Sequence, residues 1–211
     1  MPGLEGVQLH LADEVYPLWH ALQVATGDPD TALPYWAFAW GGGLALARYL
    51  AEHAEAVEGR RVLDLAAGSG LCAIAALQAG AGSVTAADVD PYAVEAMALN
   101  AKANGIRFQA TDRDLLAEPP PDVDAILAGD CWYEESLAAR VLPWLRAARD
   151  QGVDVFTGDP GRRYLPTDEL EQVAVYDVRT TTELEDLALT QGRVFTIRGG
   201  RAGPRGTMPV P

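Results

Sequence analysis

The sequence predicts an α/β fold: a Rossmann-like, seven-stranded, mostly parallel sheet with helices on both faces and an N-terminal helical cap. From Arg61 onward, short apolar runs alternate with longer Ala- and Leu-rich segments of helical character, which is the pattern of βαβ units. A glycine-rich turn, Gly68-Ser69-Gly70, follows the first of these runs. The 211 residues, 49% of them hydrophobic, suit one domain with a sizeable core.

Seven apolar runs are the expected strands, at residues 61–65, 83–87, 106–110, 123–129, 153–158, 172–178 and 193–198. Helices are expected at residues 71–78, from Pro91 onward, and at 136–149. The helix that begins at Pro91 is the best marked, because Asp90 can cap its amides and Asn104-Gly105 supplies a stop. The proline-rich segment at residues 118–122 predicts a loop, since proline lacks a backbone donor.

The first sixty residues differ in composition from the rest of the chain, because they are rich in aromatic side chains. They include an amphipathic stretch over residues 44–56. We expect residues 1–58 to form a helical, aromatic cap that belongs to the same domain as the core at residues 59–198. Within this cap, Trp36 and Trp40 are expected to line a pocket. Residues 199–211 have the Gly and Pro content of a flexible tail.

The charge of the chain narrows the choice of partners. A net charge of −14 and a pI near 4.5 weigh against broad contact with nucleic acid or an anionic membrane, because both require a surplus of Lys and Arg on one face. The N-terminus lacks the basic start and apolar middle of a signal peptide, so a cytoplasmic protein is expected. Cys72 and Cys131 are too few for a disulfide framework, and the histidines show no ligand spacing, so we expect no metal.

An acid and two glycines mark the turn after the first strand. Glycines there let a ligand approach the backbone beside a helix N-terminus, so an anionic or zwitterionic ligand is expected around Asp64, Gly68, Ser69 and Gly70. With Asp88 as the following acid, the spacing also satisfies the dinucleotide fingerprint. However, Asp64 suits a site that meets an amino group, and the turn follows sixty residues of cap. Both features favour S-adenosylmethionine over a dinucleotide.

Further acids follow the next two strands. Asp88 closes the second strand, at the sheet edge where open α/β folds bind ligands, and its carboxylate suits two ribose hydroxyls. Asp90 fits a helix cap better. Asp112 follows the third strand and is expected to accept a hydrogen bond from the adenine amino group, with Asp114 as a close competitor.

The fourth strand ends in GDCWY, where a carboxylate and a phenol stand three residues apart. Asp130 and Tyr133 are therefore the candidate catalytic residues that flank the reacting centre. The carboxylate can orient an amine, and aromatic faces, including that of Trp132, favour a cation. The alternative for Asp130 is an N-cap of the next helix. Asp159 lies in the turn-forming GDPGR segment at the same sheet edge and is expected to line the substrate mouth.

With these residues in place, the chain resembles the seven-β-strand methyltransferases and, within them, the lysine methyltransferases of the electron-transfer flavoprotein β-subunit, with their bacterial, nicotinamide-methylase-like relatives. The resemblance rests on PYWAFAWGGGLALARYL, VLDLAAGSGL, DVDPYAVEAMALNAKANG, LAGDCWYEE and GDPGRRYLP. It implies a D-x-x-Y element near the target lysine at Asp130 and Tyr133, and cofactor binding around Trp40, Gly68, Gly70 and Asp88.

One residue departs from the family pattern. Ala66 stands where D-x-G-x-G-x-G has its first glycine, and a modest effect on cofactor affinity is expected from its methyl group.

The expected function is a cytosolic, S-adenosylmethionine-dependent protein lysine N-methyltransferase acting on the electron-transfer flavoprotein β-subunit or a similar Lys-rich segment. Catalysis would be by positioning, with Asp130 orienting the amine and Tyr133 and Trp36 walling its channel. One alternative is a small-molecule N-methyltransferase for a nicotinamide-like amine or pyridine, and another is a non-catalytic module that binds NAD. An open acidic mouth would favour a protein substrate, and a closed apolar mouth a small molecule.

Overall fold

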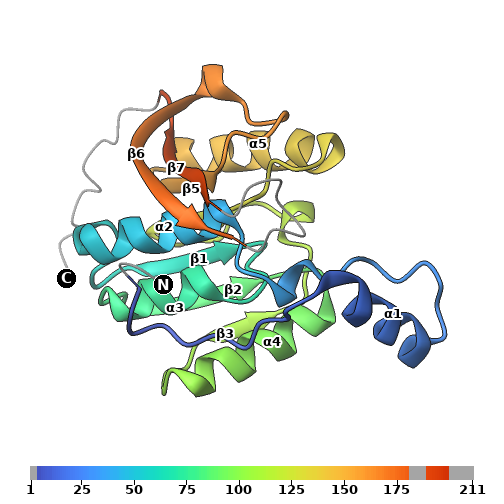
Figure 1. Ribbon diagram of the computed structural model, residues 1–211. Coiled ribbons are helices and arrows are strands. Elements are labelled where there is room, and N and C mark those ends of the chain that lie inside the picture. The colour runs from blue at the N-terminus through green and yellow to red at the C-terminus, as the bar shows by residue number, and fades with distance from the viewer. Residues whose placement is uncertain (1–3, 181–188, 200–211) are drawn as a thin grey trace.

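Seven strands form one mixed sheet in a computed structural model, which describes residues 4–180 and 189–199 (Figure 1). The strands are β1 (Arg61–Leu65), β2 (Ser83–Ala87), β3 (Gln109–Thr111), β4 (Ala125–Gly129), β5 (Asp154–Asp159), β6 (Leu170–Arg179) and β7 (Leu189–Ile197). The α-helices are α1 (Val15–Thr26), α2 (Gly41–Glu52), α3 (Leu71–Gln78), α4 (Pro91–Ala103) and α5 (Glu135–Asp150). Short 3-10 helices are η1 (Tyr35–Ala37), η2 (Ala54–Ala56), η3 (Leu115–Ala117) and η4 (Thr167–Glu169).

The strand order is β3-β2-β1-β4-β5-β7-β6. The first five strands in this order are parallel, whereas β7 runs antiparallel to both β5 and β6. The chain moves outward from β1 to β3 and then returns to place β4 on the other side of β1. The carboxyl ends of β1 and β4 therefore form the switch point at which open α/β sheets bind ligands. The predicted seven-stranded, mostly parallel sheet is confirmed.

Two apolar layers cover the two faces of the sheet. On one face, α2, α3 and part of α4 pack against alternate side chains of the strands, including Val62 and Leu127. On the other face, α5 packs against the intervening side chains, including Leu63 and Ile126. Figure 1 shows α2 and α3 side by side on the first face. Since neighbouring strand residues belong to different clusters, both faces are buried, as the continuous apolar runs predict.

Some element boundaries differ from the sequence-based expectation. The third strand begins at Gln109 instead of residue 106, because Gly105 has a φ of 65° and the amide of Ile106 bonds back to Ala101 O, which prolongs the end of α4. The last strand begins at Leu189, four residues earlier than predicted. The predicted tail at residues 199–211 lies outside the described residues except for Gly199. None of the helices in the described part of the chain is long and apolar enough to cross a membrane.

The N-terminal end of α2 lies unusually close to the sheet. The predicted helix at residues 44–56 begins instead at Gly41, so that three glycines form its first turn. A Cβ atom on Gly42 would overlap the carbonyl oxygen of Gly158 in β5, and one on Gly192 would lie 2.6 Å from Ala45 Cβ. Only glycine at these positions allows the helix backbone to rest directly on β5 and β7.

Replacing Gly42 with alanine tests this close approach. The added methyl group would also lie 2.8 Å from Asp130 Oδ1, so the helix must shift, and we expect a loss of about 1–3 kcal/mol in the free energy of unfolding. The matched control is Gly43→Ala, whose Cβ would meet its nearest neighbour, Asp130 Oδ2, at 3.6 Å. Urea denaturation of both variants should show a clearly larger loss for Gly42→Ala, and equal losses would contradict the steric explanation.

Candidate active site

A cavity of about 800 Å³ opens at the carboxyl ends of β1, β2 and β4. This volume lies within the range of small-molecule and cofactor sites. Each of the three strands ends in residues that line the cavity, at Leu65, Ala87 and Gly129, and the turn or loop that follows each strand lines it as well. The cavity therefore occupies the switch point of the sheet.

The turn after β1 uses left-handed backbone conformations. Ala66, Gly68 and Gly70 have φ values of 52°, 51° and 77°. Gly68 and Ser69 line the cavity, as predicted. Gly70 is not among the lining residues, because a Cβ there would lie 3.1 Å from Met97 Cγ, beneath the turn. Gly70 thus permits the turn to pack on α4, whereas Gly68 faces the ligand space.

Asp64 lies at the base of the cavity and is almost completely buried. One carboxylate oxygen, Oδ2, accepts a hydrogen bond from the amide of Ala73 in the first turn of α3, at 2.8 Å. Burial raises the pKa of Asp64 to about 7. A buried carboxylate of this kind is a suitable partner for an ammonium group, because a cation would restore the stabilisation lost with solvent.

Asp88, after β2, is held by two main-chain amides. Its Oδ2 accepts from Gly68 N at 2.8 Å and its Oδ1 accepts from Asp90 N at 3.0 Å. Burial raises its pKa, while these two hydrogen bonds oppose the rise. A carboxylate offers about four acceptor positions, so two remain for ligand hydroxyls. Asp90 caps α4 through Tyr92 N, as the sequence predicts.

Aromatic side chains of the cap form one wall of the cavity. Trp36 stacks on Tyr92 with ring centroids 6.1 Å apart, and Trp40 donates its indole N–H to Tyr35 O. Both tryptophans line the cavity. The Nε1 atom of Trp36 is buried without a hydrogen-bond partner among the described residues. Since buried donors are nearly always satisfied, this indole fits a site in which a bound ligand supplies the acceptor.

Asp130 projects from the end of β4 with a φ of 57°, a conformation that few residues other than glycine adopt. Its carboxylate accepts hydrogen bonds from Gly42 N at 3.0 Å and from Gly43 N at 2.6 Å, so it caps α2. Arg162 Nη1 donates to Asp130 Oδ1. The alternative prediction, that Asp130 caps the helix that follows β4, is wrong, because the helix it caps is α2.

Arg162 links the ends of β4 and β5. Besides Asp130, its Nη1 contacts Asp159 Oδ2 at 3.1 Å, and its guanidinium carbon lies 5.8 Å from the ring of Trp40. Burial raises the pKa of Asp130 to about 6, although the Arg162 guanidinium works in the opposite direction. Arg162 lines the cavity. The sequence motifs did not single out Arg162 as a site residue. Its position three residues beyond the end of β5 could have identified it, because that sheet edge holds the cavity.

Tyr133 lines the cavity near Tyr35, with ring centroids 5.4 Å apart. Both rings are partly exposed, at 46% and 42%. Burial and the neighbouring Tyr35 raise the pKa of Tyr133 to about 12. Its hydroxyl is therefore neutral at physiological pH and can act as a hydrogen-bond donor.

Besides Gly70, the structure places three further predicted site residues outside the cavity lining. Trp132 is fully buried on the α5 side of the sheet and donates to Thr157 Oγ1 at 2.8 Å, so it is a core residue and not a substrate contact. Asp159 is also fully buried and supports Arg162 from behind. Asp112 is exposed and outside the lining, whereas its competitor Asp114 lines the cavity and pairs with Arg140 at 2.5 Å.

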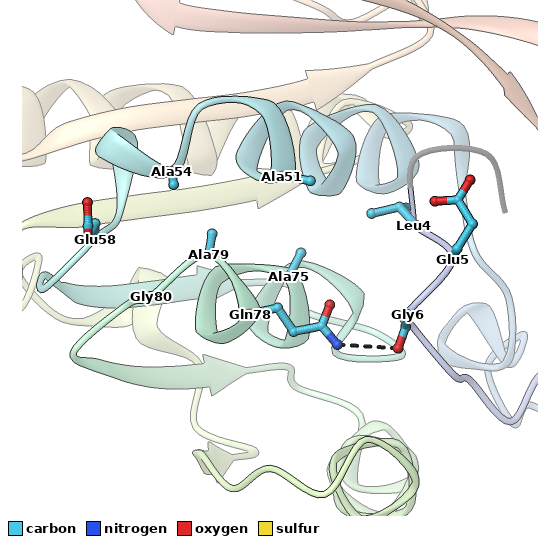
Figure 2. Close-up of a pocket in the computed structure, with 10 residues that line it drawn as sticks. All are labelled: Leu4, Glu5, Gly6, Ala51, Ala54, Glu58, Ala75, Gln78, Ala79 and Gly80. Atoms are coloured by element: carbon cyan, nitrogen blue, oxygen red, sulfur yellow. Dashed lines mark hydrogen bonds between the residues drawn. The ribbon is translucent and has the colours of Figure 1, made fainter.

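A second cavity, of about 550 Å³, lies between α2, α3 and the segment around Leu4 (Figure 2). Small side chains of the two helices, among them Ala51 and Ala75, form its walls. Its charged lining groups are Glu5 and Glu58, and Gln78 Nε2 lies 3.5 Å from Gly6 O across it. It opens beside the amino ends of the strands, away from the predicted site residues.

The fold and the first cavity are those of a class I methyltransferase. A solved ribosomal protein L11 methylase from Lactobacillus delbrueckii subsp. bulgaricus superposes with a TM-score of 0.53 at 24% identity, covering 73% of this chain and 77% of that one. A tRNA (uracil-54, C5)-methyltransferase from Pyrococcus abyssi, solved with S-adenosyl-L-homocysteine, gives a TM-score of 0.50 at 14% identity, over 72% of this chain and 38% of that one. These likenesses show the fold.

Sequence comparison narrows the class to a family. The model of the family described as ribosomal protein L11 methyltransferase (PrmA) matches residues 46–129. The chain is 39% identical to the electron transfer flavoprotein beta subunit lysine methyltransferase of Xenopus laevis over 171 residues, covering 77% of this chain and 69% of that protein. It is 36% identical to the Homo sapiens enzyme of the same description, over 77% of this chain and 64% of that protein.

A Caenorhabditis elegans homologue is 30% identical over 200 residues, covering 87% of this chain and 80% of that protein. The chain therefore belongs to the family of electron-transfer flavoprotein β-subunit lysine methyltransferases. It spans about two thirds of the length of the vertebrate relatives.

The residues around the turn fit S-adenosylmethionine. Asp64 would meet the ammonium group of its methionine part, Asp88 the ribose hydroxyls, and the unsatisfied Trp36 indole an acceptor atom of the ligand. When bound, the cofactor supplies a methyl group on a sulfonium centre.

The pKa of Asp64 predicts a pH dependence of cofactor affinity. Because Asp64 is protonated below about pH 7, it must lose a proton to pair with the ammonium group, so affinity should rise by up to about tenfold per pH unit between pH 5.5 and 7. Isothermal titration calorimetry should show this rise for S-adenosylhomocysteine, and Asp64→Asn should flatten it. Methylthioadenosine, which lacks the ammonium group, is the ligand control, and an equal slope for it would refute the assignment.

The departure at Ala66 gives a second prediction. Its φ of 52° strains a residue with a Cβ by about 1–2 kcal/mol. Ala66→Gly removes this strain but makes the unfolded chain more flexible, so we expect stability equal to or above that of the wild type. Ala67→Gly, in the same turn without a positive φ, should lose about 0.5–1 kcal/mol. Chemical denaturation measures the stability of both variants. Equal losses for Ala66→Gly and Ala67→Gly would contradict the strain at Ala66.

Proposed function

We propose that this chain is a protein lysine N-methyltransferase that acts on the electron-transfer flavoprotein β-subunit or on a protein with a similar Lys-rich segment. The observation that carries the proposal is the arrangement of Asp130 at the cavity. Three donors hold its carboxylate in place, and Tyr133 and Tyr35 stand at the same cavity. Asp130 and Tyr133, the D-x-x-Y element that the family resemblance implies, both line this cavity, which supports an amine site there.

The geometry of the Asp130 carboxylate limits how an amine can bind. Two donors, Gly42 N and Arg162 Nη1, occupy Oδ1, and one donor, Gly43 N, is paired with Oδ2. Since each oxygen has two lone pairs, one acceptor position remains, on Oδ2. An amine held there has one direction of approach, which is the condition for catalysis by positioning.

Bound S-adenosylmethionine would supply the methyl group for a direct displacement by a neutral lysine nitrogen, in which the new nitrogen–carbon bond would form as the carbon–sulfur bond broke with its electron pair left on sulfur, and the ammonium product would then release a proton. This chain contributes orientation through Asp130 and exclusion of water through the aromatic walls at Trp36, Trp40 and Tyr133.

The charge of the cavity supports a basic substrate. Among its lining residues, six carboxylates (Asp64, Asp88, Asp90, Asp114, Asp130 and Glu134) stand against three guanidinium groups (Arg113, Arg140 and Arg162). Glu134 is exposed beside Tyr133 and lies outside the ion pairs of the described residues. A negative mouth attracts Lys-rich segments and raises their local concentration. In keeping with the charge of the chain, we propose a cytoplasmic location.

In the direct test, the purified protein is incubated with labelled S-adenosylmethionine and electron-transfer flavoprotein. A separate reaction contains nicotinamide in place of the flavoprotein. We expect label on a lysine of the β-subunit, located by peptide mass spectrometry. If label appears instead on a lysine of another protein in a cell extract, the proposed activity stands and that protein is the substrate. Methylation of nicotinamide alone would overturn the proposal.

Variants test the roles of Asp130 and Asp88. Asp130→Asn should lower kcat by about 100-fold or more, because the amine loses its acceptor, while cofactor affinity stays within about twofold. Asp88→Ala should weaken cofactor binding about tenfold, since two ribose hydrogen bonds are lost. The control is Glu135→Gln, an exposed acid in the same chain segment outside the cavity lining. Calorimetry and initial rates check these outcomes, and equal loss of binding and transfer in Asp130→Asn would contradict the division of roles.

A further inference from the structure

Asn100, in α4, is a completely buried polar side chain that uses both ends of its amide. Its Nδ2 donates to Ser69 O at 2.8 Å, in the cofactor turn. Its Oδ1 accepts from His10 N at 2.7 Å, and His10 Nδ1 lies 3.2 Å from the same oxygen. One side chain therefore connects the cofactor turn to an N-terminal segment that lies 59 residues before that turn in the sequence.

The bond to Ser69 O fixes the peptide that closes the cofactor turn. In a trans peptide the carbonyl and the amide point in opposite directions. The Ser69 carbonyl points to Asn100, while the amide of the same peptide, Gly70 N, donates to Ala67 O at 2.8 Å. Both ends of this peptide are thus held, and Ser69 lines the cavity.

The N-terminal segment at residues 4–12, hereafter the strap, runs along α3 and α4 to η1 (Figure 1). Its Leu4 is buried in the core that α2 and α3 share. Asn104, the C-cap residue of α4 and one turn after Asn100, binds the backbone of Gln8 with two hydrogen bonds, of 2.9 and 2.6 Å.

At its other end, the strap is joined to the aromatic wall. The amide of Ala12 donates to Ala37 O at 2.9 Å, directly after Trp36. The strap is therefore tied to two walls of the cofactor cavity: to the turn through Asn100, and to Trp36 through η1.

We infer that Asn100 is a positioning residue for cofactor binding, through which the docked strap holds the Gly68–Gly70 turn in its binding conformation. Cofactor affinity then depends on strap docking. By thermodynamic linkage, bound cofactor stabilises the docked strap by the same factor. The inference concerns the cofactor alone and does not depend on which substrate accepts the methyl group.

A pair of substitutions at an exposed position separates this coupling from a loss of packing. His10→Pro removes the backbone N–H that donates to Asn100 Oδ1, and His10→Ala keeps that N–H while removing the ring. We expect the dissociation constant of S-adenosylhomocysteine to rise roughly tenfold for His10→Pro and to stay within about twofold of wild type for His10→Ala.

A second variant acts from the other end of the same connection. Asn100→Asp keeps the acceptor for His10 N but places an oxygen against Ser69 O in place of the donor. We expect roughly a tenfold or larger rise in the dissociation constant, compared with a smaller rise for Asn104→Asp, which loosens the strap without touching the turn. If Asn100→Asp fails to fold, the His10 pair decides the question alone.

Amide exchange measured by NMR supplies a readout that a purely structural role would not move. In the wild type, saturating S-adenosylhomocysteine should slow exchange at His10 N, and in His10→Ala it should do the same. Unchanged exchange at His10 N on cofactor binding, or wild-type affinity in folded His10→Pro or Asn100→Asp, would overturn the inference.

Discussion

The carboxylate of Asp130 at the N-terminus of α2 is the interaction on which the site depends. It brings the end of β4, the first turn of α2 and Arg162 after β5 to one point. The helix supplies no side-chain cap of its own, so this acid satisfies amides that would otherwise lack a partner. Because the glycines of α2 let its backbone rest on β5, the carboxylate that caps the helix also faces the cavity.

The three cavity acids Asp64, Asp88 and Asp130 differ in how many of their acceptor positions the protein itself occupies. Main-chain amides take one position on Asp64 and two on Asp88, while amides and Arg162 together take three on Asp130. The fixed bonds orient each carboxylate and leave the remaining acceptor positions to ligands. The division between a cofactor side and an acceptor side that we propose rests on this use of backbone donors more than on the type of residue.

The same three acids also lower the free energy of unfolding of the ligand-free protein as pH rises. The pKa values of Asp64, Asp88 and Asp130 are all raised above those of an unfolded chain, mainly by burial. Each raised pKa means that the folded state binds its proton more tightly, so the stabilisation present below about pH 4 is lost as pH rises through the folded value. Cationic and hydroxyl groups of a bound ligand would offset this loss.

The sequence by itself determined the sheet, the cofactor turn and the acids at the strand ends, because alternating apolar runs and glycine-acid spacing depend on local chemistry. Tertiary structure alone decided which of those residues share a cavity. Trp132 and Tyr133 are neighbours, yet the direction of the chain after β4 buries one and leaves the other at the cavity. Likewise, the hydrogen-bond partners of Asp130 and Asn100 lie 31 to 90 residues away, and no local pattern encodes such contacts. Packing of α2 and the strap against the sheet brings them together.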